Sequence, residues 1–107
     1  MPSLLPTPAN SESIPSLGRS AAEELARTLR AVADPTRLQL LSVILDSADG
    51  RATVTQLTEA LGLRQPTVTH HVRILVDDGL LTREPEGKYV WLSVALDRRP
   101  AIEDLLR

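Results

Sequence analysis

The sequence predicts a mainly α-helical fold with one small β-hairpin, in the element order α-α-α-α-β-β-α. Two apolar-periodic segments, residues 54–61 and 65–78, are separated by a three-residue turn containing Gly62, which is the pattern of a helix-turn-helix. After the second segment the apolar period changes from about 3.6 to 2, as it does where helix gives way to strand. The chain has no Phe, and its aromatic residues are Tyr89 and Trp91. The core must therefore be built from Leu, Val, Ile and Ala, which favours helix packing.

The composition indicates one small globular domain. A chain of 107 residues has room for a single core, and its 42% apolar content suits a globular protein. It contains no Cys, which excludes disulfides, thiolate metal sites and cysteine nucleophiles. Its two His are adjacent and no Gly-rich phosphate loop is present, so an enzyme is not expected. No segment has the pattern of a signal peptide or a membrane span, so we expect a cytoplasmic protein without membrane contact.

The N-terminal part divides into an arm and a first helix. Residues 1–18 are rich in Pro and Ser and predict a flexible arm, which leaves residues 19–107 as the folded domain. Ser20 followed by Glu23 has the spacing of a capping box. We therefore expect a first helix over residues 20–33.

The next two helices have clear start signals. Asp34 is a good cap, and Pro35 suits the first position of a helix, which should end before the Asp-Gly pair at residues 49–50. Thr53 and Gln56 repeat the capping-box spacing at the start of the first helix of the helix-turn-helix.

The second helix of the helix-turn-helix has one apolar and one polar face. Pro66 lies in its first turn, and Val68, Val72, Leu75 and Val76 recur at helical spacing. The side chains expected on the outward face are Gln65, Thr67, Thr69, His70 and Arg73. Such side chains hydrogen-bond base edges or phosphates, as a helix in the major groove must. His71 lies nearer the core, where a packed and hydrogen-bonded histidine is expected.

A β-hairpin follows directly. Residues 80–84 and 88–94 alternate with period two around a predicted turn at residues 85–87. A hairpin in this place is a wing. Its basic side chains, as phosphate contacts or as solvated charges, are Arg83 and Lys88.

The charge balance argues against a strong nonspecific nucleic-acid binder. The net charge is −2 and the isoelectric point about 5.6. From Arg64 to Trp91, both included, four basic residues are matched by four acidic ones. Attraction to phosphate must then come from the local placement of the basic groups.

The last segment indicates an oligomer. A short helix over residues 100–106 has too few apolar residues to form its own core, so it should pack on another element or on a partner chain. Together with the helix over residues 20–33, it is expected to form the interface of a two-fold dimer. The second helices of the two helix-turn-helix motifs, which are the recognition helices, should then lie roughly 34 Å apart.

Three segments resemble the ArsR/SmtB family of winged-helix repressors: residues 33–38, which contain Asp-Pro-Thr-Arg, residues 61–75, which contain His-His, and residues 79–81 with 87–91. The resemblance implies a bacterial homodimer, joined through its first and last helices, that occupies operator DNA and leaves it when an effector binds. It also implies that Gln65, Thr69 and His70 meet DNA, whereas Pro66 stands where the family commonly has Ser.

The chain departs from its relatives at the effector sites. It has Thr-Val-Thr at residues 53–55, where thiolate-sensing members have Cys-Val-Cys. Near the last helix, the side chains that could bind a metal are the carboxylates of Asp97, Glu103 and Asp104. They are either weak metal ligands or simply a helix cap and surface charges. We expect that no cofactor is required. The effector stays open between a divalent transition metal such as nickel or zinc, a small ligand and an effector-sensing partner protein.

A second class of function stays open as well. Winged helices also serve as protein-interaction modules that do not bind DNA, and the balanced charge of the recognition region allows this.

Overall fold

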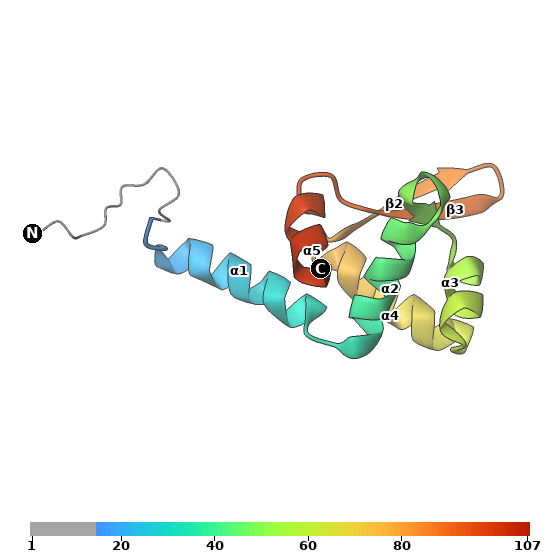
Figure 1. Cartoon of the computed structure of the whole chain (residues 1–107), viewed down its shortest axis with the longest axis horizontal. Helices are drawn as coiled ribbons and strands as arrows, with labels where there is room; N and C mark the ends of the chain where they lie inside the picture. Colours follow the sequence, from blue (N-terminus) through green and yellow to red (C-terminus); the bar gives the residue numbers. More distant parts are fainter. Residues whose placement is uncertain (1–14) are drawn as a thin grey trace, which may run out of the picture.

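The computed structural model describes residues 15–107, and within them it has five α-helices and one three-stranded antiparallel sheet (Figure 1). The helices are α1 (Arg19–Val32), α2 (Pro35–Asp46), α3 (Val54–Leu61), α4 (Gln65–Asp77) and α5 (Arg99–Leu106). The strands are β1 (Arg51–Ala52), β2 (Leu81–Glu86) and β3 (Tyr89–Val94), in the order β1-β3-β2, and a short 3-10 turn, η1 (Ala48–Gly50), precedes β1. The predicted winged helix-turn-helix is confirmed, with one short strand in addition.

The predicted arm over residues 1–18 is described only in part. Residues 1–14 lie outside the described part of the chain, and residues 15–18 are exposed and carry no helix or strand. Within residues 15–107, no helix is long and apolar enough to cross a membrane.

The helix-turn-helix begins and ends where its sequence signals lie. The Thr53 hydroxyl accepts a hydrogen bond from the Gln56 backbone N–H at 3.1 Å, and the Gln56 side chain accepts from the Thr53 N–H at 3.0 Å. Gly62 ends α3 in the left-handed conformation, with φ of 68°. This conformation turns the chain sharply into α4, so the tight corner of the motif depends on a residue without a Cβ.

The capping box predicted for α1 is wrong. The helix begins at Arg19, one residue earlier, and its N-cap Gly18 makes no side-chain cap. The Glu23 carboxylate accepts instead from Arg19 Nε at 3.1 Å, one turn away along the helix. Because Ser20 lies inside the first turn, it cannot cap the helix, and Glu23 forms an i,i+4 ion pair instead.

The core lies between α2, α3, α4 and the inner face of the sheet. Its largest fully buried side chains are Leu40, Leu41, Ile44, Leu57, Val68, Leu75, Leu80 and Leu92. α5 adds Ile102, whereas α1 buries only Ala31 and Val32 at its C-terminal end. Figure 1 shows the rest of α1 extending away from this core.

The hairpin turn is shorter than predicted. β2 continues through Pro85, and Glu86 pairs with Tyr89, so the turn is the two residues Gly87 and Lys88. Gly87 has φ of 64°, which suits a two-residue turn that follows the twist of the strands. β2 is an edge strand, where a Pro without an N–H is tolerated.

Candidate nucleic-acid interface

The outward face of α4 forms a shallow hollow. Val68, Val72 and Leu75 are buried against the rest of the domain, so the opposite side of the helix faces solvent. We call the side chains that line this hollow the recognition surface, which consists of Gln65, Pro66, Thr69, His70 and Arg73. It offers an amide, a hydroxyl, an imidazole and a guanidinium within three turns of one helix, the groups that base edges and phosphates require.

Four of the five predicted side chains of α4 are thus brought together. Gln65, His70 and Arg73 are exposed and Thr69 is half-buried. Thr67 is exposed but does not line the hollow. It lies roughly 130° around the helix from the centre of the recognition surface, since each residue turns about 100°.

His71 is the packed histidine that the sequence predicts. It is half-buried, and its Nδ1 lies 3.2 Å from Arg37 Nη1 of α2. Burial lowers the pKa of His71 below its usual range. The Asp34 carboxylate has a smaller, opposing effect on this pKa, and Arg37 and His70 lower it slightly further. Its ring also meets the ring of His70 edge-on, with 5.4 Å between the centroids.

The wing, residues 81–94, separates its charges by face. Arg83 is paired with Leu92, so its side chain leaves the strand on the side of the sheet that packs on the helices. Glu84 is paired with Trp91 and therefore leaves on the other side, as Glu86 does. The two carboxylates that neighbour Arg83 in sequence are directed away from it.

A residue of the additional strand β1 contacts the outer face of the wing. Arg51 of β1 pairs with Glu86 at 3.3 Å, and its guanidinium carbon lies 4.3 Å from the ring centroid of Trp91. Sequence reasoning missed Arg51, because a two-residue strand is too short to show alternation. Lys88 is exposed in the turn at the tip.

Arg64 is another residue that the prediction omitted. It is the N-cap of α4, directly before Gln65, and it is exposed. A basic side chain at the N-terminus of a recognition helix adds to the partial positive charge of that end, and its position before Gln65 could have indicated this.

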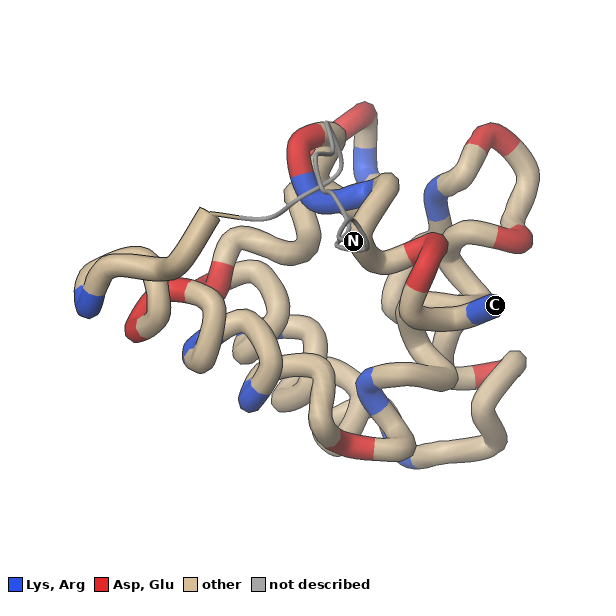
Figure 2. The backbone as a smooth tube through the Cα atoms, turned by 60° about the vertical axis from the view of Figure 1, so that its left-hand side comes forward, with Lys and Arg blue, Asp and Glu red and all other residues tan. Residues whose placement is uncertain are grey.

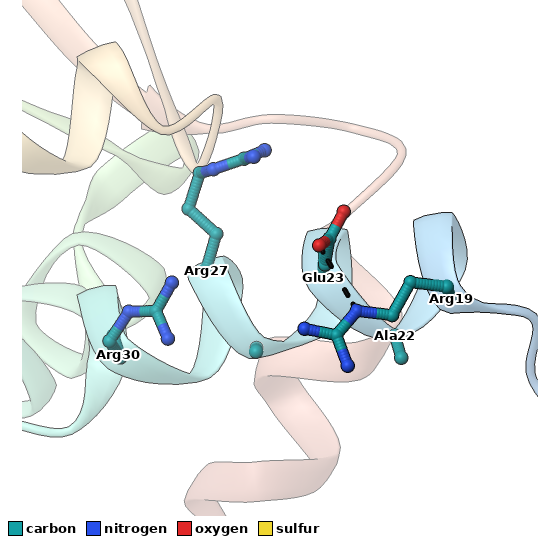
Figure 3. A pocket seen from close by; sticks show the side chains of 6 residues that line it. Arg19, Ala22, Glu23, Arg27 and Arg30 are labelled. Carbon is teal, nitrogen blue, oxygen red and sulfur yellow. Dashed lines mark hydrogen bonds and ion pairs between the residues drawn. The ribbon is translucent and has the colours of Figure 1, made fainter.

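Elsewhere the charges are mixed. Figure 2 shows basic and acidic residues interspersed along the backbone. On α1, a hollow is lined by Arg19, Glu23, Arg27 and Arg30, and the dashed line in Figure 3 joins Arg19 to Glu23. This lining has a single carboxylate, already held in an ion pair, and no nucleophile, so it offers no pair of groups for acid–base chemistry.

The carboxylates near the last helix do not gather into a site. Glu103 accepts from Arg99 Nε at 3.0 Å, and Asp97 lies 3.8 Å from Arg98 Nε. Asp104 lines a groove between α1 and α5. Within residues 15–107, no three His, Asp or Glu side chains are close enough together to hold a metal ion. Thr53 is used as a helix cap.

An apolar groove of about 390 Å³ runs between α1 and α5. Among its lining residues Leu25, Leu29 and Leu105 are 48%, 47% and 55% exposed. Arg98 Nη1 donates to Thr28 Oγ1 at 2.8 Å and so ties the start of α5 to α1. The first and the last helix therefore share one uncovered apolar surface.

Comparison with known proteins finds regulators of the same design. Residues 32–84 match the family model of the helix-turn-helix domain. The chain is 41% identical over 81 residues to a probable mercury resistance operon repressor of Streptomyces lividans, covering 76% of this chain and 60% of that protein. It is 32% identical over 76 residues to an uncharacterized HTH-type transcriptional regulator of Methanocaldococcus jannaschii, covering 71% and 83%.

The fold is found among solved structures too. HlyU from Vibrio cholerae superposes with a TM-score of 0.74 at 27% identity, covering 82% of this chain and 94% of that one. The chain spans about three fifths of the length of the first curated relatives it matches.

Proposed function

The chain belongs to the ArsR/SmtB family of helix-turn-helix transcriptional regulators, and from this membership we propose that it is a dimeric repressor that binds an operator through α4 and the wing. The observation that carries the proposal is the recognition surface, where four polar side chains of one helix share an exposed hollow opposite the core. Like its relatives, the protein is a regulator and not an enzyme. We expect it to act in the cytoplasm, where the DNA is.

Each part of the interface has its own task in this proposal. Gln65, Thr69 and His70 read base edges in the major groove, because they lie near the N-terminal half of α4. The phosphate contacts come from the basic side chains that flank them, which are Arg73, Arg83 and Lys88. Thr67, at the edge of the helix, joins these contacts. The separation of the wing charges supports this assignment, because Glu84 and Glu86 do not face Arg83.

The α1–α5 groove is the proposed dimer interface. A single domain gains little by leaving three leucines of one groove half-exposed, whereas a second copy would cover them. A two-fold arrangement through this groove would present two copies of α4 to successive turns of the operator.

Release from the operator is proposed to follow binding of an effector that is not a tightly held transition metal. Thr53 and Thr55, at the start of α3, offer poor ligands for soft ions. Within residues 15–107, Asp97, Glu103 and Asp104 do not form a group that could hold a metal, and two of them lie beside arginines. The candidates are a small nonmetal ligand, a partner protein, or a carboxylate site completed across the dimer.

Salt-dependent binding to duplex DNA tests the function. The wild-type protein should select a sequence from a random pool and lose affinity as salt rises. His70→Ala or Thr69→Ala should reduce discrimination against single-base changes, by roughly tenfold or more at the contacted position. Arg83→Ala should weaken binding to every sequence and reduce the slope of log affinity against log salt by about 1.

Arg19→Ala is the charge-matched control, since Arg19 lies at the end of α1 that extends away from α4 (Figure 1), and its effect on DNA should be small. Absence of any salt-dependent DNA binding would instead favour the protein-interaction module.

A further inference from the structure

One side chain joins three helices behind the recognition surface. Arg37, in the first turn of α2, donates from Nε to the carbonyl oxygen of Ala31 near the end of α1. Its Nη1 lies 3.2 Å from Nδ1 of His71 on α4. The backbone N–H of the same residue is held by the Asp34 carboxylate at 3.0 Å. Arg37 is half-buried, so these contacts are shielded from water in part.

The pairing defines the state of His71. A guanidinium has donors only, so Nδ1 of His71 must be the acceptor and the proton of the neutral ring must lie on Nε2. A protonated ring would place a second positive charge against Arg37 and would lose the hydrogen bond. The ring of His71 in turn packs edge-on against His70, which lines the recognition surface.

We propose that Arg37 is a positioning residue for DNA recognition: by joining the end of α1 to His71, it sets the orientation in which α4 presents His70. The inference rests on the proposed function and adds a connection between the dimerisation helix and the reading helix. Because α1 also lines the groove for the second copy, a change at that groove would reach α4 through this link.

The link is sensitive to pH. The charged groups that act on His71 are Asp34 and Arg37 from α2 and His70 from its own helix, and burial is the largest effect. Since burial lowers the pKa of His71, the neutral, hydrogen-bonded ring persists to a pH below 6.5, the ordinary histidine value. Acidification through that range protonates the ring and breaks the link, so operator affinity falls as pH falls.

The test compares wild type with Arg37→Lys, His71→Leu, the double variant and His71→Asn. Lys cannot reach the Ala31 carbonyl and His71 at once, and Leu removes the acceptor, whereas Asn keeps an acceptor near the position of Nδ1 and does not titrate. Gln39→Ala, at an exposed position of α2, is the control. Affinity is measured for the duplex that the wild type selects from a random pool and for a scrambled duplex.

Arg37→Lys and His71→Leu should each lose roughly tenfold in affinity for the selected duplex, and the double variant should lose no more than either. Affinity for the scrambled duplex should stay within about twofold. From pH 7.5 to 5.5 the wild type should lose several-fold more affinity than His71→Asn. About tenfold is the ceiling, because an ordinary histidine is about 90% protonated at pH 5.5.

Equal losses on both duplexes, additive losses in the double variant, or the same pH profile in His71→Asn would each overturn the inference. If the wild type selects no duplex, only the proposed function is refuted. The inference about Arg37 is then decided by a measurement that needs no DNA. In NMR spectra, Arg37→Lys should raise the pKa of His71 and shift the ring resonances of both histidines but not the Trp91 indole. Unmoved His70 and His71 resonances would sink the idea.

Discussion

A single side chain caps the first helix of the helix-turn-helix. Thr53 is buried and makes one half of a reciprocal cap with Gln56, so its hydroxyl and its N–H are both satisfied within the first turn of α3. Thr55 lies two residues on, is exposed, and takes no part in this cap. Two threonines of the same turn therefore have different roles.

Replacing Thr53 by Ala should lower the free energy of unfolding by about 1 kcal/mol, the usual cost of losing a helix cap. Urea denaturation measures it, with Thr55→Ala as the matched control, for which a change below about 0.5 kcal/mol is expected. Equal losses in the two variants would show that the capping box does not stabilise α3.

Hydroxyl and carboxylate groups among the candidate metal ligands are already engaged within the chain. Thr53 is committed to its cap, and Glu103 and Asp97 lie beside Arg99 and Arg98. Titration calorimetry of the isolated protein with nickel, zinc and cobalt should therefore find only binding weaker than about micromolar. A stoichiometric site of submicromolar affinity would contradict this, and its loss in Glu103→Ala would locate it at α5.

Among the elements, the wing depends most on a neighbour. β2 and β3 project beyond the helices, and Arg51 of β1 holds their outer face by stacking on Trp91 and pairing with Glu86. Both contacts are partly exposed, which limits what each adds to stability.

Arg51→Ala should cost about 1 kcal/mol of stability, and Glu86→Gln, which keeps the stacking, less than half of that. Trp91 is the only tryptophan, so its fluorescence reports the wing directly during denaturation. A red-shifted emission in native Arg51→Ala, absent from Glu86→Gln, is expected. Identical native spectra would mean that the stacking does not order the wing.

For the whole molecule, the α1–α5 groove is the surface that a single chain leaves incomplete. Leu29→Glu places a charge in the middle of the groove and should convert the proposed dimer to monomer, because burying an unpaired carboxylate is costly. Leu96→Glu is the control, since Leu96 is 84% exposed and lies outside the groove.

Sedimentation should show a dimer for the wild type and Leu96→Glu and a monomer for Leu29→Glu, with operator binding lost in parallel. A wild-type protein that is monomeric at micromolar concentration would refute the dimer, and a dimeric Leu29→Glu would place its interface elsewhere.

What the sequence by itself determined was local. Caps such as Asp34 and Thr53, the left-handed Gly62 and the apolar period of α4 predicted the helix-turn-helix, since these interactions join residues within a few positions of one another. The same period placed Gln65, Thr69, His70 and Arg73 on one face, as the structure has them. The predicted cap of α1 failed because the helix begins at Arg19, which leaves Ser20 inside the first turn and not at the cap position.

Only the tertiary structure decided the contacts between distant segments. The pairing of β1 with β3, the brace of Arg51 on Trp91 and the link from Arg37 to His71 join residues more than 30 positions apart, which leave no periodic trace in the sequence. The exposure of Leu25, Leu29 and Leu105 was likewise decided by packing: a sequence pattern predicts an apolar face, but only the folded chain determines whether that face is covered.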